Sequence, residues 1–208
     1  RLVEVLAPIA HNDNWYWPSA ALYQANDVQL EEMRQLLLNK LTNQIERYRA
    51  EEPETAKSLT QLHKTITNWR IARRLPIKID YDLARIKTSA NPRLPRGKYI
   101  LELAPRMKTV QLFGAVKKTS NMPHLRHADV SKYIPHQTRT NLADKSYVVL
   151  IQADGREINA PVAYWNKAHQ EAMPSSQIFV PFKTSLFNSE FTSINQQIKT
   201  LALHRVRQ

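Results

Sequence analysis

The hydrophobic period of the chain changes at residues 69–80, and this change constrains the fold more than any other feature of the sequence. Before it, apolar residues recur at helical spacing, whereas after it short segments alternate apolar and polar residues as strands do. Pro76 disfavours helix here, because it has no N–H to donate and crowds the preceding residue out of the α region. Ile77 and Ile79 alternate with polar residues, which predicts strand and turn over 77–86. The pattern predicts an α+β fold.

Three arginines, Arg70, Arg73 and Arg74, lie at this change of period. In one interpretation they form a solvated basic helix end, which the helix dipole favours. In the other, an arginine lies in the groove where helices meet sheet and binds a carboxylate or a partner's carbonyl oxygens. Arg74 is the leading candidate for a binding residue, with Arg73 beside it, because its planar fork holds two oxygens in a geometry that lysine cannot reproduce.

The charge of the chain is distributed unevenly. The formal net charge is +12; residues 1–70 carry 8 basic and 9 acidic side chains, and residues 71–208 carry 22 and 9. The strand-rich part is therefore basic and the helical part is nearly neutral. Such a field attracts nucleic acid, anionic lipid head groups, acidic polysaccharide or acidic protein, and it does not choose among them.

The composition disfavours several classes of protein. The three glycines are not clustered, so neither a phosphate-binding loop nor a dinucleotide fingerprint is present, and we expect no cofactor. The absence of cysteine removes disulfides, thiolate metal sites and cysteine nucleophiles. No run of 18 apolar residues predicts a membrane span. The sequence opens at Arg1 without an apolar leader, so we expect any signal peptide to have been removed.

Two helices are predicted before the change of period. Asp27 is a candidate N-cap for a helix to about Arg49, and a second helix is expected from about Thr55 to Ile71 after a short acidic turn. Together they make an antiparallel helical hairpin, whose apolar stripes face each other and the body or, alternatively, a partner. The stripe positions are Val28, Met33, Leu36, Leu37, Leu41 and Ile45, with Lys40 among them, and then Leu59, Leu62, Ile66 and Trp69.

Short strands with turn residues between them dominate after the change. We expect strands at 98–103, 109–116, 147–151, 156–160 and 178–182, and a short helix over 129–134. Asp154-Gly155 joins two of the strands as a hairpin, because its turn needs positive φ. From 109 onward this is the element order of a β-grasp unit. Residues 77–103 with a short helix over 1–7 could be part of a second unit that lacks its opening hairpin.

An amphipathic helix is expected from about 188 to 208, with Phe187, Phe191, Ile194, Ile198 and Leu201 at helical spacing. It either packs on the body or docks on a membrane surface or a partner channel.

Aromatic residues provide the other candidate binding sites. Trp15 and Trp17 lie in an aromatic turn that could stack on sugars or bases, or could close the edge of a domain. Trp165 with Lys167 could offer a sugar a stacking ring with polar neighbours, or Trp165 could cap the second core.

Catalytic and metal sites are disfavoured. His124 and His127 lie in a loop without a third metal ligand nearby in the sequence. Asp80 and Asp82 are paired acids, which in basic surroundings are more often ion-pair partners than hydrolytic carboxylates.

Several stretches in order resemble the GfcC-like capsule biosynthesis family, periplasmic proteins of exopolysaccharide export loci in Gram-negative bacteria. The stretches are Trp17-Pro18-Ser19-Ala20-Ala21-Leu22, Arg74-Leu75-Pro76-Ile77-Lys78-Ile79-Asp80, Leu112-Phe113-Gly114-Ala115-Val116, Ala160-Pro161-Val162-Ala163-Tyr164-Trp165-Asn166-Lys167 and the amphipathic tail. The resemblance implies two tandem β-grasp (SLBB-like) domains, a helical hairpin inserted in the first, and a C-terminal amphipathic helix.

On this basis the expected first domain comprises residues 1–27 and 72–106, and the hairpin comprises 28–71. The second domain is expected over 107–183 and the final helix over 184–208. The family's noted arginine falls on Arg74. Family members carry a strand hairpin before the stretch that starts here at Arg1, so an unpaired sheet edge and a homodimer are expectations.

The sequence therefore predicts a non-enzymatic periplasmic accessory protein of capsule or exopolysaccharide assembly or export. The expected partners are an outer-membrane polysaccharide export protein of the Wza type, other capsule-locus proteins, or acidic polysaccharide. The alternatives are a polysaccharide-modifying enzyme and, less favoured, a nucleic-acid-binding module, whose affinity would fall steeply with salt.

Overall fold

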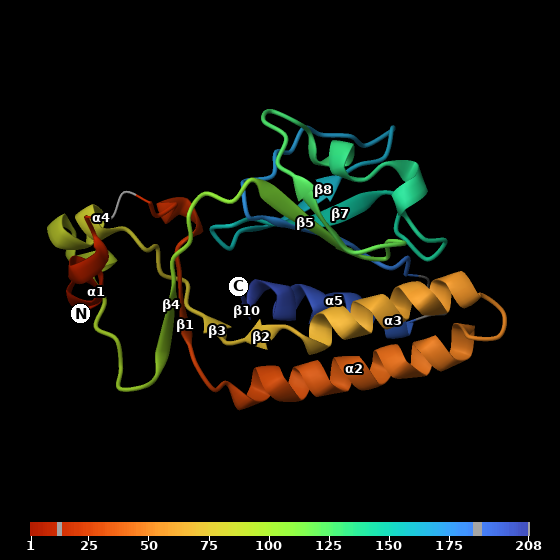
Figure 1. Cartoon of the computed structure of the whole chain (residues 1–208), viewed down its shortest axis with the longest axis horizontal. Coiled ribbons are helices and arrows are strands. Elements are labelled where there is room, and N and C mark those ends of the chain that lie inside the picture. The colour runs from red at the N-terminus through yellow and green to blue at the C-terminus, as the bar shows by residue number, and fades with distance from the viewer. Residues whose placement is uncertain (12–13, 185–188, 208) are drawn as a thin grey trace.

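A five-stranded mixed sheet and the helices beneath it form the larger part of the computed structural model, which describes residues 1–11, 14–184 and 189–207 (Figure 1). The sheet order is β6-β5-β9-β7-β8, with β5 and β9 parallel and the other neighbours antiparallel. The strands are β5 (Thr109–Gly114), β6 (Ser120–Pro123), β7 (Tyr147–Ile151), β8 (Glu157–Pro161) and β9 (Gln177–Val180). The predicted α+β class is confirmed.

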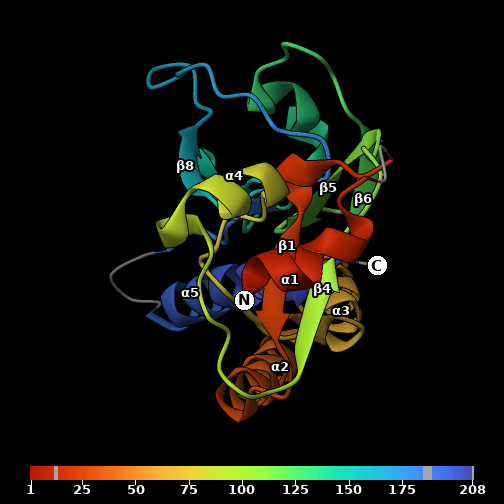
Figure 2. The ribbon, with the colours of Figure 1, turned by 90° about the vertical axis from the view of Figure 1, so that its left-hand side faces the viewer.

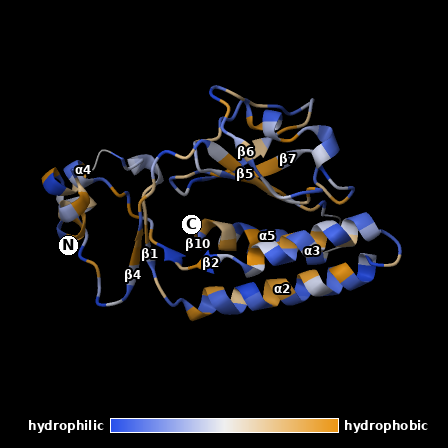
Figure 3. Cartoon of the chain, viewed as in Figure 1, coloured by the Kyte–Doolittle hydropathy of each residue, from blue (hydrophilic) through white to orange (hydrophobic). Residues whose placement is uncertain are grey.

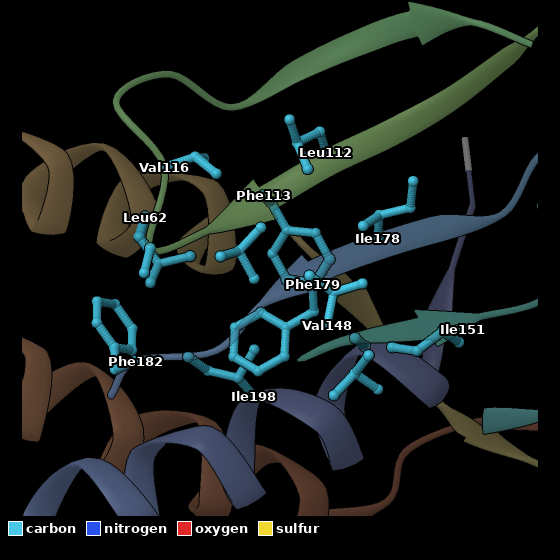
Figure 4. Close-up of a cluster of buried hydrophobic side chains, with 14 of the residues drawn as sticks. Leu62, Leu112, Phe113, Val116, Val148, Ile151, Ile178, Phe179, Phe182 and Ile198 are labelled. Carbon is cyan, nitrogen blue, oxygen red and sulfur yellow. The ribbon is translucent and has the colours of Figure 1, made fainter. Parts of the chain in front are cut away.

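Three helices lie on one side of this sheet, two of them next to it and the third beyond them (Figure 1). They are α2 (Val28–Tyr48), α3 (Pro53–Thr67) and α5 (Ser189–Leu203). Phe113 and Phe179 project from neighbouring strands into the core, and Ile198 of α5 belongs to the same cluster (Figure 4). The Trp69 ring, after α3, lies 5.5 Å from the Phe113 ring in an edge-on contact. The helical hairpin therefore shares its core with the five-stranded sheet.

A second, smaller layer lies at one end of the molecule (Figure 2). Its sheet has the order β3-β1-β4, all antiparallel, from β1 (Ala21–Gln24), β3 (Arg73–Arg74) and β4 (Tyr99–Glu102). The helices α1 (Leu2–Leu6) and α4 (Tyr81–Ile86) lie beside it. Figure 3 shows hydrophobic residues along β1 and β4, in keeping with a separate small apolar cluster around Leu2, Leu6, Leu22 and Ile79.

The strand β10 (Arg205–Val206) follows α5 and pairs antiparallel with β2 (Arg70–Ile71), just before β3. Five 3₁₀ segments complete the described elements: Ala7–Ile9, Trp17–Ser19, Thr88–Ala90, Val130–Tyr133 and His136–Thr138. The final helix packs on the body, because Phe191, Ile194 and Leu201 are buried. Phe187 and residue 188, where this helix was expected to begin, lie outside the described residues.

Most predicted elements are present, and the hairpin through Gly155 is confirmed with φ of 92°. The strand predicted over 77–86 is wrong, because the Asp80 side chain accepts a hydrogen bond from the Leu83 N–H (2.9 Å) and caps helix α4. The second helix ends earlier than expected, since residues 70–71 form β2. Val28 and Leu36 do not belong to the buried stripe of α2: they are 68% and 57% exposed.

Candidate functional site

Arg74 of β3 ties the small sheet to the β7–β8 turn. Its backbone N–H donates to His204 Nδ1 (2.9 Å), and its Nη2 donates to the Ala153 carbonyl oxygen (2.9 Å). The guanidinium carbon also lies 5.9 Å from the centre of the Tyr23 ring. Arg74 therefore fits the second interpretation of the sequence, in which an arginine lies where helices meet sheet and binds a carbonyl oxygen. The carbonyl that it binds, however, belongs to its own chain.

Gly155 allows this close approach. A Cβ at this position would lie 2.8 Å from Arg74 Nε and 2.9 Å from its Cζ, and the backbone has a positive φ of 92° that side chains rarely adopt. The sequence identified Gly155 as a turn residue only. Its second role, giving the guanidinium room, depends on a contact between residues far apart in the chain.

Burial shifts the pKa values of the groups around Arg74. It lowers the pKa of Arg74, while the neighbouring charges of Tyr23 and Glu102 act in the opposite direction. Burial, followed by the Glu102 charge, raises the pKa of Tyr23 to about 12. Burial and the positive charge of Arg73 lower the pKa of His204, so its ring stays neutral and accepts the Arg74 N–H.

A cleft of about 610 Å³ opens beside Arg74, between the small sheet and the β7–β8 turn. Its apolar part comes mainly from residues 75–79 and Leu203, and Trp17 adds an aromatic wall. Charged side chains complete the lining: Arg74, Lys78, Asp80, Asp154 and Arg156. Arg156 Nε lies 2.7 Å from Asp154 Oδ2, and Lys78 Nζ lies 3.0 Å from Asp80 Oδ2. Such a lining can hold a ligand with both apolar faces and anionic groups.

The other predicted site residues lie elsewhere, apart from Trp17. Arg73 donates from Nε to Asp27, the residue that caps α2, and from Nη2 to Gln29 (3.2 Å). Trp15 is half-buried, and its indole Nε1 makes no hydrogen bond to any described residue. The two aromatics of this turn are therefore partly packed, and only Trp17 faces the cleft.

Trp165 and Lys167 lie on a surface turn that the structure does not bring to Arg74. Trp165 is 75% exposed, so the prediction that it caps the second core is wrong. Strand β8 ends at Pro161, and Trp165 lies in the exposed segment that follows the strand. Lys167 Nζ lies 3.8 Å from Asp129 Oδ1.

A buried polar cluster behind the small sheet was missed by sequence reasoning. Glu102 Oε1 accepts from Arg207 Nε (2.6 Å), and Glu102 Oε2 accepts from the Arg207 backbone N–H (2.9 Å). The Tyr23 hydroxyl lies 3.1 Å from Glu102 Oε2 and 3.2 Å from the Arg205 carbonyl oxygen. Arg207 Nη2 also donates to the Ser19 carbonyl oxygen (2.5 Å). No local pattern in the sequence indicated this cluster, because residues 204–207 were expected to lie in the final helix and Glu102 is 105 residues away from Arg207 in the chain.

The described residues hold no group of three or more His, Asp or Glu side chains placed to bind a metal ion. His124 Nε2 lies 2.9 Å from the Ala172 carbonyl oxygen, which is a structural contact. Asp82 is an exposed partner of Arg85, 3.8 Å away, while Asp80 caps α4, so the two acids do not form a catalytic pair. Among the described helices, none is both long and apolar enough to cross a membrane.

Comparison with known proteins identifies the family. The sequence model of the N-terminal part of capsule biosynthesis GfcC matches residues 1–106, and that of the C-terminal part matches residues 118–207. The chain belongs to the capsule biosynthesis GfcC family. It is also 32% identical, over 197 residues, to a protein of Escherichia coli (strain K12) named "Uncharacterized protein YjbG", with 94% of this chain and 78% of that protein covered. The resemblance found in the sequence is confirmed, and GfcC membership supports a role in capsule assembly.

Proposed function

We propose that this GfcC-family protein is a non-catalytic periplasmic accessory protein of capsule or exopolysaccharide assembly. It binds either the export machinery, such as an outer-membrane export protein of the Wza type, or the acidic polysaccharide itself. The observation that carries the proposal is the cleft beside Arg74, which combines an aromatic wall with three basic side chains. A scaffold of this kind needs a shaped binding surface and no convergent catalytic groups.

The sheet order favours β-grasp units as the framework. Numbered along this unit, the larger sheet has the order 2-1-5-3-4, with the first and last strands parallel at its centre, as in ubiquitin-like folds. The smaller sheet, from residues 21–24, 73–74 and 99–102, is taken as part of a second unit. The two domains bounded near residue 106 belong to this proposal.

Within the cleft, Lys78 and Arg156 are the side chains best placed to meet a ligand. Their side chains are 74% and 67% exposed, and each has a carboxylate partner that a ligand anion could replace. Arg74 is committed to the Ala153 carbonyl, so its first role is to hold the cleft in shape. Replacing Arg74 therefore mixes binding with folding, whereas replacing the other two separates them.

The test is a binding measurement with the variant Lys78→Gln/Arg156→Gln. Its control is Lys57→Gln/Lys64→Gln on α3, which removes the same charge from an exposed helix face. The cleft variant should bind polygalacturonate about fivefold more weakly than wild type, or should lose an export protein in pull-downs from periplasm, whereas the control should retain binding. Equal binding by both variants, to the polymer and to every periplasmic partner, would refute the cleft as the binding site.

A further inference from the structure

The turn at residues 163–167, which follows β8, presents two neighbouring aromatic side chains to solvent. Tyr164 is 99% exposed and Trp165 is 75% exposed. Aromatic side chains of this size are usually buried over most of their area. At these exposures the rings form a convex apolar point, not the wall of a hollow. The segment after β8 projects from the body at the side away from α2 (Figure 2).

This aromatic turn is held in place by hydrogen bonds. Asn166 Oδ1 accepts from the Ala163 N–H (3.0 Å), and Asn166 Nδ2 donates to the Ser146 carbonyl oxygen (3.1 Å). The Val162 N–H donates to the same carbonyl oxygen (2.9 Å). Ala163 is buried at the base of the turn. The two rings are therefore presented by an ordered turn, which lowers the entropy cost of using them in binding.

These hydrogen bonds also indicate what does not bind there. A sugar that stacks on an aromatic ring needs polar groups beside the ring for its hydroxyls. Both side-chain polar atoms of Asn166, the nearest amide in sequence, already make hydrogen bonds, Oδ1 to Ala163 within the turn and Nδ2 to Ser146 outside it. A binding partner that accepts aromatic rings and needs few hydrogen bonds therefore fits this turn better than a carbohydrate does.

Cationic side chains flank the rings. Lys145 is exposed and directly precedes Ser146, to which the turn is tied, and the Lys167 side chain is 46% exposed. The nearest acid to Lys167 is Asp129, which is 8% exposed and accepts hydrogen bonds from the N–H groups of Ser131 and Gln170. The carboxylate of Glu171 is paired with His169, whose Nε2 lies 3.0 Å from Glu171 Oε1. The charge offered beside the rings is therefore positive.

We propose that the aromatic turn docks on an anionic phospholipid surface. Tyrosine and tryptophan favour the membrane interface, where the ring lies among apolar groups and the polar atom stays wet. Lysines beside them are attracted to anionic head groups and keep their ammonium groups in the head-group layer. A stable protein partner would need about 800 Å² on this side. The apolar side chains Val28, Leu36 and Ile86, exposed by more than half, lie on α2 and α4 and do not extend the patch.

The experiment is co-sedimentation of the full chain with phosphatidylcholine vesicles that contain or lack phosphatidylglycerol. The variants are Tyr164→Ser/Trp165→Ser and Lys145→Gln/Lys167→Gln. The matched control is Ile86→Ser, which removes an 83% exposed apolar side chain from α4. Circular dichroism should show the same fold for all, since the altered side chains are exposed.

Wild type should bind the anionic vesicles, and removing the two rings should weaken binding by tenfold or more. Removing the lysines should weaken it by about fivefold per residue at low salt, and this effect should shrink as salt is added. Trp165 fluorescence, taken as wild type minus Trp165→Phe, should shift to shorter wavelength with these vesicles. The proposal is overturned if wild type ignores the anionic vesicles, if Ile86→Ser and the ring variant lose binding equally, or if Trp165 responds only to acidic polysaccharide.

Discussion

Gly155→Ala should destabilise the protein through Arg74 as well as through its own backbone. The positive φ of 92° costs an alanine about 1–2 kcal/mol. The new Cβ would lie 2.8 Å from Arg74 Nε, so the guanidinium must move and its bond to the Ala153 carbonyl lengthens or breaks. For a charged donor that is partly exposed, this loss is worth about 1–2 kcal/mol more. The expected total is about 2–4 kcal/mol.

Urea unfolding of a double-mutant cycle separates the two contributions. In an Arg74→Met background no guanidinium is displaced, so Gly155→Ala should cost only the backbone part, about 1–2 kcal/mol. The coupling between the two positions is then about 1–2 kcal/mol. Gly97→Ala is the control, since its nearest neighbour, an atom of the Tyr99 ring, lies 3.6 Å away. It should change stability by less than about 1 kcal/mol.

Two results would refute this reasoning. Equal costs of Gly155→Ala with and without Arg74 would mean that the turn and the guanidinium do not press on each other. A cost below about 1 kcal/mol in the wild-type background would mean that the turn relaxes to a conformation alanine accepts. The first would also remove the argument that Arg74 holds the cleft in shape.

Three further variants test other parts of the structure. Gly114→Ala should lower the free energy of unfolding in urea by about 3–5 kcal/mol, because φ is 104° and a Cβ would lie 2.3 Å from a backbone oxygen of β9. An unchanged unfolding midpoint would contradict the close approach of β5 and β9 at this position. Glu102→Ala should lower the free energy of unfolding by about 3–5 kcal/mol, since it leaves the Arg207 guanidinium buried without its carboxylate. Adding Arg207→Ala should recover part of this loss, and strictly additive losses in the double variant would argue against the ion pair. His204 has a lowered pKa, so its contribution is complete above about pH 6.5 and is lost as pH falls below that value. The melting temperature of wild type relative to His204→Asn should therefore be constant above about pH 6.5 and should fall below it, and a difference that is the same at every pH would contradict the lowered pKa.

Local patterns in the sequence were sufficient where a local interaction decides the structure. Asp27 was predicted to cap α2, and its side chain accepts from the Leu30 N–H (3.0 Å). The Asp154-Gly155 turn and the strands beside it were also predicted, because positive φ is a property of the turn itself. The segment 77–86 failed for a local reason of its own: alternation suggested strand, but the capping by Asp80 stabilises a helix that starts within that segment.

The rest depended on contacts between distant residues. β2 and β10 are two residues long, and each exists only because the other is alongside it, so neither leaves a periodic pattern. The same holds for Glu102 and Arg207, which are 105 residues apart in the chain. Arg74 was identified as important from its residue type and position, but the carbonyl that it binds belongs to a residue 79 positions away and leaves no local pattern.

The two GfcC sequence models divide the chain at about residue 106, yet the molecule is interlocked across that division. α2 and α3 come from the first part and share their core with the sheet built by the second part. In return, β10 from the second part pairs with β2 of the first, just before Arg74. A fragment ending near residue 106 would leave the hairpin with an uncovered apolar seam, and the remaining fragment would have only α5 beneath its sheet. Exchanging one half for an unrelated module would therefore expose the apolar surface of the other half, so a substitution in this shared core constrains residues of both halves.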